Sequence, residues 1–482
     1  MTDRLSPLDL SFLHGEDNDH AAQMHVASIG IFDGPPPPHN ELTSGLLDRM
    51  HLIPRYRQRV QDVPYALGRP VWVDATDFDI NYHVRRTALA APGDDDDLRQ
   101  LAGTLLSQRL DRSKPLWEIW IVENLAEGKW ATISKVHHCM VDGVSGSELM
   151  SILLDLTTDT PPVERVDWTP RTVSRDDLTR DALRSHVANA GAQLRTVAQL
   201  LRRPADGLQQ AVDIVSGLAS VSSGQSLMGD STLTGTIGAH RIISWADASL
   251  SDINTIRGAF GGTVNDVVLA AVTNGFRELL ASRSEPLEGR TIRCLIPVSV
   301  RASRADGAAS GDGSLDNKVS AMFAALPVGL DSPTDRLEAI RHQLAELKES
   351  KQALAAKALT DLGAHAPVAL LALGSRVAST AVISRLNALE TVATNVPGPP
   401  MPLYAHGRRL RRAYPYVPIA APIRIAIAVF SYDGAVTFTV TGDRDTSPDI
   451  DVLSRGISAG LADLHRLAPT GPPVAPPEER TL

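Results

Sequence analysis

A strand that runs into a polar loop stands out in the first third of the chain, and it reads Trp130-Ala131-Thr132-Ile133-Ser134-Lys135-Val136-His137-His138-Cys139-Met140-Val141-Asp142-Gly143. The run of apolar and β-branched residues over 130–136 predicts a strand. The segment Ser147–Leu156 reads as a helix. The sequence therefore places the two adjacent histidines on a strand-to-helix loop, where rigid elements often hold catalytic groups.

The two histidines are expected to do different jobs, because neighbouring side chains along a strand point to opposite faces. Histidine can take up and return a proton near neutral pH, so either His137 or His138 is a candidate base. Asp142 could fix the loop through a salt bridge or orient an imidazole, and the sequence leaves both roles open. Gly143 lets the backbone approach closely or adopt positive φ.

The motif is also compatible with a structural histidine, a metal site or a nucleophilic serine. A lone histidine is most often structural, and zinc normally needs three or four protein ligands. No local third ligand has convincing spacing, although Asp142 stays a candidate. The segment Gly143-Val144-Ser145-Gly146 lacks the spacing of a nucleophilic serine elbow. A histidine base without a metal is therefore the preferred interpretation.

Length and composition limit the class of protein and the number of domains. The 482 residues are enough for two or three domains, and 43% hydrophobic with 21% charged residues is typical of a globular protein. A net charge of −9 argues against an extended nucleic-acid surface. Two cysteines, Cys139 and Cys294, exclude a disulfide scaffold and suit a reducing cytosol. No signal peptide and no run of about 18 uncharged apolar residues is expected.

Strand-like and helix-like segments alternate along two parts of the chain. We expect an N-terminal half over 1–161, a helical connection over 162–238, a C-terminal half over 239–467 and a disordered tail over 468–482. The strands and helices predicted at specific positions are His25–Phe32, Glu41–Met50 with Asn40 as N-cap, Leu116–Val122, Asn265–Leu280, Ile292–Val300, Val319–Leu326, Pro333–Ser350, and a hairpin turning at Asp433-Gly434.

Five blocks occur in an order that resembles a known family. They are Leu5-Ser6-Pro7-Leu8-Asp9 with Met24-His25, Pro115-Leu116-Trp117, His137–Gly143, Asn265–Ala270, and Asn395-Val396-Pro397-Gly398-Pro399. Together they resemble the bacterial wax ester synthase/diacylglycerol acyltransferase family, within the chloramphenicol acetyltransferase-like group that includes peptide-synthetase condensation domains. The resemblance covers nearly the whole chain.

The resemblance implies an α/β fold of two chloramphenicol acetyltransferase-like halves, each a mixed sheet with helices, and a tunnel between them. It implies an acyl-CoA-dependent O-acyltransferase that esterifies diacylglycerol or a long-chain alcohol. His138 would be the general base, with no covalent intermediate and no cofactor, since acyl-CoA is a substrate. Asp142 would then be structural, and Arg301 is our candidate for its ion-pair partner by analogy.

Two roles are open for each of the other blocks. Pro115, Leu116 and Trp117 are candidates for substrate binding, although packing is favoured for a large aromatic. Asn395, Pro397 and Gly398 are also substrate-binding candidates, or form only a rigid turn. Asn265 is either a helix N-cap alone or an active-site amide that stabilises a developing oxyanion.

Two further functions stay open at this point. One is an acyltransferase or condensation-type enzyme for a polar natural-product acceptor, and the other is a non-catalytic lipid- or CoA-binding protein. The lipid substrates predict peripheral attachment to a membrane or lipid droplet from the cytoplasm. The candidate contacts are Ala366–Leu373 and the basic segment Arg195–Arg203. Acceptor preference, acyl chain length and oligomeric state cannot be derived from the sequence.

Overall fold

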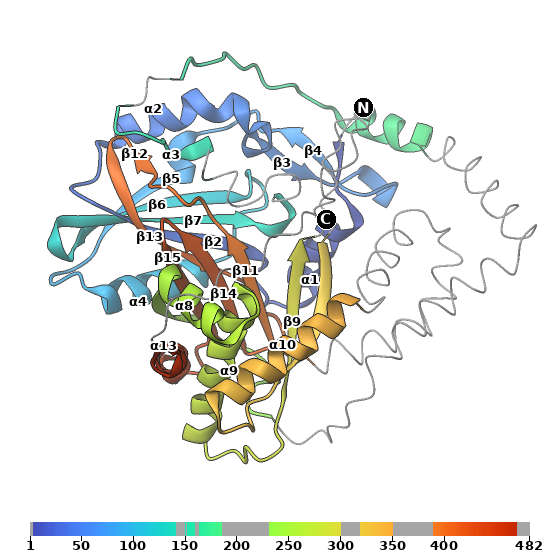
Figure 1. The fold of residues 1–482 in the computed structure, drawn as a ribbon. Helices are drawn as coiled ribbons and strands as arrows, with labels where there is room; N and C mark the ends of the chain where they lie inside the picture. The colour runs from blue at the N-terminus through green and yellow to red at the C-terminus, as the bar shows by residue number, and fades with distance from the viewer. Residues whose placement is uncertain are drawn as a thin grey trace, which may run out of the picture. The chain divides into compact units, whose positions relative to one another are not determined.

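The computed structural model describes residues 3–140, 150, 152–159, 163–185, 231–299, 319–349 and 389–469 (Figure 1). Contacts divide these residues into two compact units. The described residues up to 185 and residues 402–413 belong to the first unit. Residues 231–349 as described, 389–401 and 414–469 belong to the second. Each unit is considered by itself.

The first unit is built on a six-stranded sheet with the strand order β12-β13-β2-β7-β6-β5. Its strands are β12 (Tyr404–Ala405), β13 (Arg408–Tyr416), β2 (His25–Phe32), β7 (Lys129–His137), β6 (Trp117–Leu125) and β5 (Val84–Ala88). β2 and β6 flank β7 in antiparallel fashion, and β5 is parallel to β6. A second, antiparallel sheet has the order β1-β4-β3, from β1 (Asp3–Arg4), β4 (Val71–Asp74) and β3 (Gln58–Gln61).

Helices of the first unit include α1 (Pro7–Asn18), α2 (His39–Arg49), α3 (Ile80–His83) and α4 (Asp95–Leu106). Capping boxes start α1, from Ser6 and Asp9, and α4, from Asp94 and Asp97. The prediction that Asn40 caps α2 was wrong. Pro38 occupies the N-cap position without a side-chain hydrogen bond, and Asn40 lies inside the first turn.

The second unit contains another six-stranded sheet, with the order β10-β9-β11-β14-β15-β8. Its strands are β10 (Val319–Leu326), β9 (Ile292–Ser299), β11 (Thr391–Pro397), β14 (Ile425–Tyr432), β15 (Ala435–Asp443) and β8 (Arg241–Ser249). β11 is parallel to both neighbours and the other pairs are antiparallel, so this sheet is mixed. Asp433-Gly434 turns the β14–β15 hairpin, which confirms that prediction.

Helices α8 (Leu250–Phe260), α9 (Val264–Ser282), α10 (Pro333–Glu349) and α13 (Ile450–Leu467) belong to the second unit. α9 is buried along most of its length and contributes to one large apolar core with the sheet strands and α13. Two sheets with attached helices confirm the predicted mixed α/β class. The predicted strands His25–Phe32 and Val319–Leu326 have the bounds expected.

None of the helices in the described part of the chain is long and apolar enough to cross a membrane. Most of the helix predicted over Ser147–Leu156 lies outside the described residues, as do the two segments predicted to contact a membrane, Ala366–Leu373 and Arg195–Arg203.

Trp117, at the start of β6, and Trp130 are the two largest fully buried side chains of the first unit. The Nε1–H of Trp117 donates to the Tyr56 carbonyl at 2.8 Å. The His83 ring stacks on it with centroids 4.4 Å apart, and His83 Nδ1 bonds to the Trp117 carbonyl at 2.8 Å. Trp117 therefore ties the segment before β3 and helix α3 to the central sheet.

We predict that Trp117→Ala lowers the free energy of unfolding by about 3–5 kcal/mol, because a large cavity replaces the indole. Trp120 is the matched control, since it lies on the same strand with its side chain half-buried. Trp120→Ala should cost about 1 kcal/mol. Urea unfolding of both variants measures the difference, and equal losses would contradict the assignment of Trp117 to the core.

Candidate active site

The two adjacent histidines have different environments. His137 ends β7 and is 1% exposed, whereas His138 begins the short 3-10 turn His138–Met140 and is half-buried. The backbone N–H of His137 donates to the Leu116 carbonyl at 2.9 Å. One ring is therefore enclosed by the protein, and the other keeps contact with solvent.

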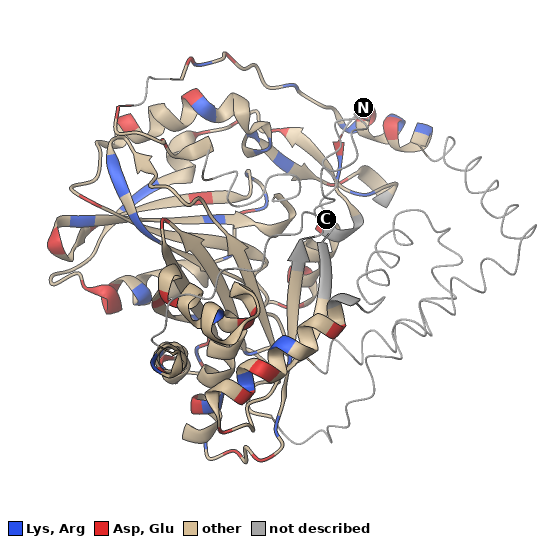
Figure 2. Ribbon diagram, in the orientation of Figure 1, with Lys and Arg blue, Asp and Glu red and all other residues tan. Residues whose placement is uncertain are grey.

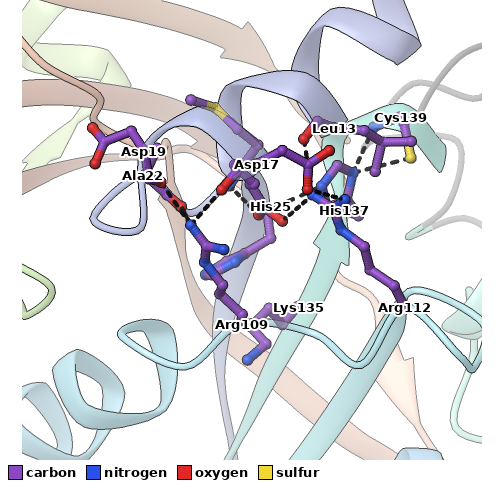
Figure 3. A network of polar contacts seen from close by, with 12 residues as sticks. Leu13, Asp17, Asp19, Ala22, His25, Arg109, Arg112, Lys135, His137 and Cys139 are labelled. Carbon is purple, nitrogen blue, oxygen red and sulfur yellow. Dashed lines mark hydrogen bonds and ion pairs between the residues drawn. The ribbon is translucent and has the colours of Figure 1, made fainter.

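Both nitrogens of the His137 ring face polar groups (Figure 3). The Cys139 backbone N–H donates to Nδ1 at 3.2 Å, and Cys139 Sγ lies 3.0 Å from the same atom. A nitrogen that accepts an N–H bond carries no proton, so this bonding pattern assigns the proton of neutral His137 to Nε2. Nε2 faces Oε1 of Glu16 at 3.5 Å.

Glu16 is a carboxylate near the C-terminal end of α1 with 2% exposure. Its Oε1 accepts the Met24 backbone N–H at 2.7 Å, and its Oε2 accepts Nη2 of Arg112 at 3.1 Å. Burial alone would raise the pKa of Glu16, but the contacts with His137, Met24 and Arg112 outweigh burial and lower the pKa to about 2. The group is therefore ionised at neutral pH.

His138 is held through its backbone and through one face of its ring. Its backbone N–H donates to the Met24 carbonyl at 2.8 Å. Its ring stacks on Phe12, with centroids 4.1 Å apart and an interplanar angle of 24°. α1 thus supplies a platform for the imidazole.

Two cationic side chains, the half-buried Arg109 and the buried Lys135, hold the surrounding loops together (Figure 3). Nη2 of Arg109 donates to the carbonyls of Glu16, Asp19 and Ala22 at 2.6–3.0 Å. Nζ of Lys135 donates to the carbonyls of Leu105 and Gln108 at 3.2 and 2.8 Å. Burial, and then the charge of Lys135, lower the pKa of His25, whose Nε2–H donates to the Leu106 carbonyl at 3.0 Å.

The Pro115-Leu116-Trp117 block is buried beside the end of β7. Leu116 and Trp117 are 0% exposed, and Pro115 is buried. The Leu116 carbonyl accepts the backbone N–H of His137, so the block helps to fix the end of β7. This burial fits the packing role that the sequence favoured, and substrate binding by the three residues stays a prediction.

In the second unit, the alternative that Asn265 is only a helix cap was wrong. Thr263 is the N-cap of α9, and it forms a capping box with Asp266. Asn265 lies in the first turn, where its Oδ1 accepts Nδ2 of Asn395 at 3.3 Å. Two predicted site residues, 130 positions apart, thus form one amide pair.

The direction of that hydrogen bond decides which N–H donors of the pair remain available. Because Asn265 accepts through Oδ1, its Nδ2 keeps two N–H donors. Within the described residues, no hydrogen bond from that nitrogen is observed. An amide N–H held by a second amide at a helix start is a suitable donor for an oxygen that gains negative charge.

Pro397 ends β11 and is exposed, and Gly398 follows it. The Gly398 N–H donates to the Ser431 carbonyl at 2.9 Å. A Cβ on Gly398 would lie 2.3 Å from that oxygen and 2.3 Å from the Phe430 ring. Close packing against β14 therefore requires glycine here, which supports the rigid-turn interpretation of this block.

Asp142, Gly143 and Arg301 lie outside the described residues, so their predicted roles stay predictions. Among the described residues, no group of three or more His, Cys, Asp or Glu side chains has the arrangement of a metal site. Glu16, Phe12 and Arg112 were not singled out from the sequence.

Solved structures share this two-sheet architecture. A wax ester synthase/diacylglycerol acyltransferase from Marinobacter aquaeolei VT8 matches with a TM-score of 0.66 and 24% identity, over 97% of this chain and 99% of that one. The first condensation domain of the calcium-dependent antibiotic synthetase matches with a TM-score of 0.60 and 14% identity, over 97% and 98%. The fold is therefore of the class that acyltransferases and condensation domains share.

Sequence comparison narrows the class to one family. The wax ester synthase/diacylglycerol acyltransferase catalytic domain matches residues 5–268, and the family's C-terminal domain matches residues 315–465. A probable diacylglycerol O-acyltransferase of Mycobacterium tuberculosis is 34% identical over 462 residues, which is 95% of each chain. The chain belongs to the wax ester synthase/diacylglycerol acyltransferase family, and it is an acyltransferase of lipid biosynthesis.

The capping geometry predicts that substitutions at Thr263 and at Asn265 change the free energy of unfolding by different amounts. We predict that Thr263→Ala lowers the free energy of unfolding by about 1 kcal/mol, because the helix loses its N-cap. Asn265→Ala should change it by less than about 0.5 kcal/mol, since alanine's helix propensity offsets the lost amide bond. Chemical denaturation measures both, and a larger cost for Asn265→Ala would restore the cap interpretation.

Proposed function

We propose that this enzyme transfers the acyl group of an acyl-CoA to the free hydroxyl of diacylglycerol, and that it also accepts long-chain alcohols. The products would be triacylglycerol and wax esters. The observation that carries the proposal is the difference between the two histidines. The ring of His137 is enclosed and engaged, whereas His138 is half-buried on a turn whose backbone is fixed.

The chemistry needs one group that takes a proton and later returns it. As the acceptor oxygen attacks the thioester carbonyl carbon, His138 takes the hydroxyl proton. The C–O bond forms, and the carbonyl oxygen gains negative charge. The C–S bond then breaks, and protonated His138 gives its proton to the leaving CoA thiolate. Atoms and charges balance without a covalent enzyme intermediate.

Asn265 keeps its predicted catalytic role as a proposal, and for Asn395, predicted to bind substrate, we add an orienting role. The free N–H donors of Asn265 Nδ2 suit stabilisation of the carbonyl oxygen during attack. Asn395 would orient that amide through its bond to Oδ1. The substrate-lining role of Pro397 stays a prediction, as does the tunnel that the family resemblance implies.

Diacylglycerol is favoured as acceptor because the relative that is 34% identical over 95% of both chains bears that activity in its name. The condensation-type alternative shares the fold, but it lacks support from the family matches, which cover residues 5–268 and 315–465. A non-catalytic binder would not require a proton acceptor on a fixed turn.

We predict that His138→Ala abolishes acyl transfer, whereas His137→Ala keeps measurable activity. The assay uses purified enzyme and radiolabelled palmitoyl-CoA, with diacylglycerol, hexadecanol and short alcohols as acceptors and chromatographic separation of the esters. Circular dichroism establishes that both variants are folded. Equal loss in two folded variants would remove the assignment of a single base, and no ester with any lipid acceptor would contradict the proposed substrates.

Peripheral attachment to a membrane or lipid droplet is a second part of the proposal, because the proposed acceptors reside in lipid. Within a chain of net charge −9, four arginines occur within five residues on β13: Arg408, Arg409, Arg411 and Arg412 (Figure 2). The side chains of Arg411 and Arg412 are exposed. Such a local cluster can attract anionic headgroups in spite of the overall charge.

We predict that the enzyme floats with anionic liposomes at low salt and is released at high salt, since screening weakens exposed charges. Replacing Arg411 and Arg412 together by glutamine should reduce flotation, whereas replacing Arg175 and Arg180 by glutamine should not. Arg175 and Arg180 are also exposed, in the helical segment 175–185. Resistance of the bound protein to both high salt and carbonate would contradict peripheral attachment.

A further inference from the structure

The Glu16 carboxylate lies between helix α1 and the turn that carries the two histidines. We propose that Glu16 is a positioning residue that fixes the place of His138 through Met24 and through the ring of His137. The inference rests on the proposed role of His138 as the base. Glu16 itself has no part in the proton transfer.

The first argument is the hydrogen-bond inventory of the carboxylate. An ionised carboxylate only accepts hydrogen bonds. Two donors bond to Glu16, the Met24 N–H at 2.7 Å and the Arg112 guanidinium at 3.1 Å, and Nε2 of His137 lies 3.5 Å from Oε1. Glutamine cannot replace both carboxylate oxygens as acceptors, because its amide would point N–H groups at one of the two donors.

The second argument is a path of contacts from Glu16 to the backbone of the base. Glu16 accepts from the N–H of Met24, and the carbonyl of Met24 accepts from the N–H of His138 at 2.8 Å. Met24 is thus held on both sides of its backbone, just before β2. A displacement of Met24 would carry the start of the turn with it.

A second path runs through His137. Its Nδ1 accepts the N–H of Cys139, the residue after His138. Its Nε2 lies 3.5 Å from Oε1 of Glu16, and a nearby carboxylate favours the tautomer with the proton on Nε2. That tautomer leaves Nδ1 as the acceptor of the Cys139 N–H, so the ring of His137 links α1 to the residue that follows His138.

The third argument is the register of α1. Phe12 and Glu16 are four residues apart on this helix, so they lie on the same face. Phe12 stacks against the ring of His138, and Glu16 fixes the backbone of His138 through Met24. One face of α1 therefore constrains both the ring and the backbone of His138. A carboxylate with a purely structural ion pair to Arg112 would require neither Met24 nor His137.

The test compares Glu16→Gln with Asp17→Asn in the full-length enzyme, with palmitoyl-CoA and diacylglycerol as substrates. Asp17 is the matched control, because it is the adjacent acid on α1 and binds Nη1 of Arg112 at 2.7 Å but is exposed. We expect Glu16→Gln to lower kcat per folded molecule about 10–100-fold, with KM for palmitoyl-CoA changed less than about threefold. Asp17→Asn should stay within about twofold of the wild type.

The folded fraction, measured by circular dichroism, separates positioning from stability. A merely structural Glu16 would reduce the amount of folded enzyme and leave kcat per folded molecule unchanged, which would overturn the inference. If Glu16→Gln does not fold, Glu16→Asp is used, since it keeps the charge beside Arg112 and withdraws the oxygens by about 1.5 Å. Wild-type kcat in Glu16→Asp would equally overturn it.

The outcome for His138 distinguishes this inference from the proposed function. If His138→Ala keeps wild-type activity, the proposed base is wrong and the positioning inference falls with it. If His138→Ala is inactive while Glu16→Gln has wild-type kcat per folded molecule, the proposed function stands and the positioning inference alone is overturned.

Discussion

A buried carboxylate must have partners, and the first unit is organised around that constraint at Glu16. Removing an ion from water costs several kcal/mol unless charges and hydrogen bonds compensate it. Here a guanidinium and a backbone N–H bond to the carboxylate, and the His137 ring faces it at 3.5 Å. Each partner comes from a different segment, so satisfying the carboxylate brings α1, the start of β2 and the end of β7 into one arrangement.

That arrangement gives two adjacent histidines separate tasks. His137 accepts the Cys139 N–H at Nδ1, and it acts as a link between a helix and a turn. His138 occupies the turn itself, with a fixed backbone and one ring face against Phe12. The second unit also assigns the structural task and the proposed chemical task to different residues. The capping box of Thr263 and Asp266 fixes the start of α9, so the amide pair of Asn265 and Asn395 does not have to stabilise the helix.

Much of this could be predicted from the sequence, for identifiable reasons. Strong periodicity over 25–32 and 319–326 defined strands with the observed bounds. The motif at His137 and His138 was visible because the two residues are adjacent. Glu16 was not visible, because in the run Glu16-Asp17-Asn18-Asp19 it looks like the solvated end of a helix. Only the fold shows that one of these acids is buried. The sequence also left the N-cap of α9 open, because Thr263 and Asn265 are both good capping residues. Only the backbone shows that Thr263 is the cap.

The most direct test of this account is the protonation of the His137 ring, measured by nitrogen-15 NMR on enzyme with labelled histidine. The signal is assigned by its loss in His137→Gln. The account predicts a proton on Nε2 and none on Nδ1, because Nδ1 accepts the Cys139 N–H and Nε2 faces Glu16. A proton on Nδ1 would contradict it, since Nδ1 could not then accept the Cys139 N–H and His137 could not hold the turn that carries His138.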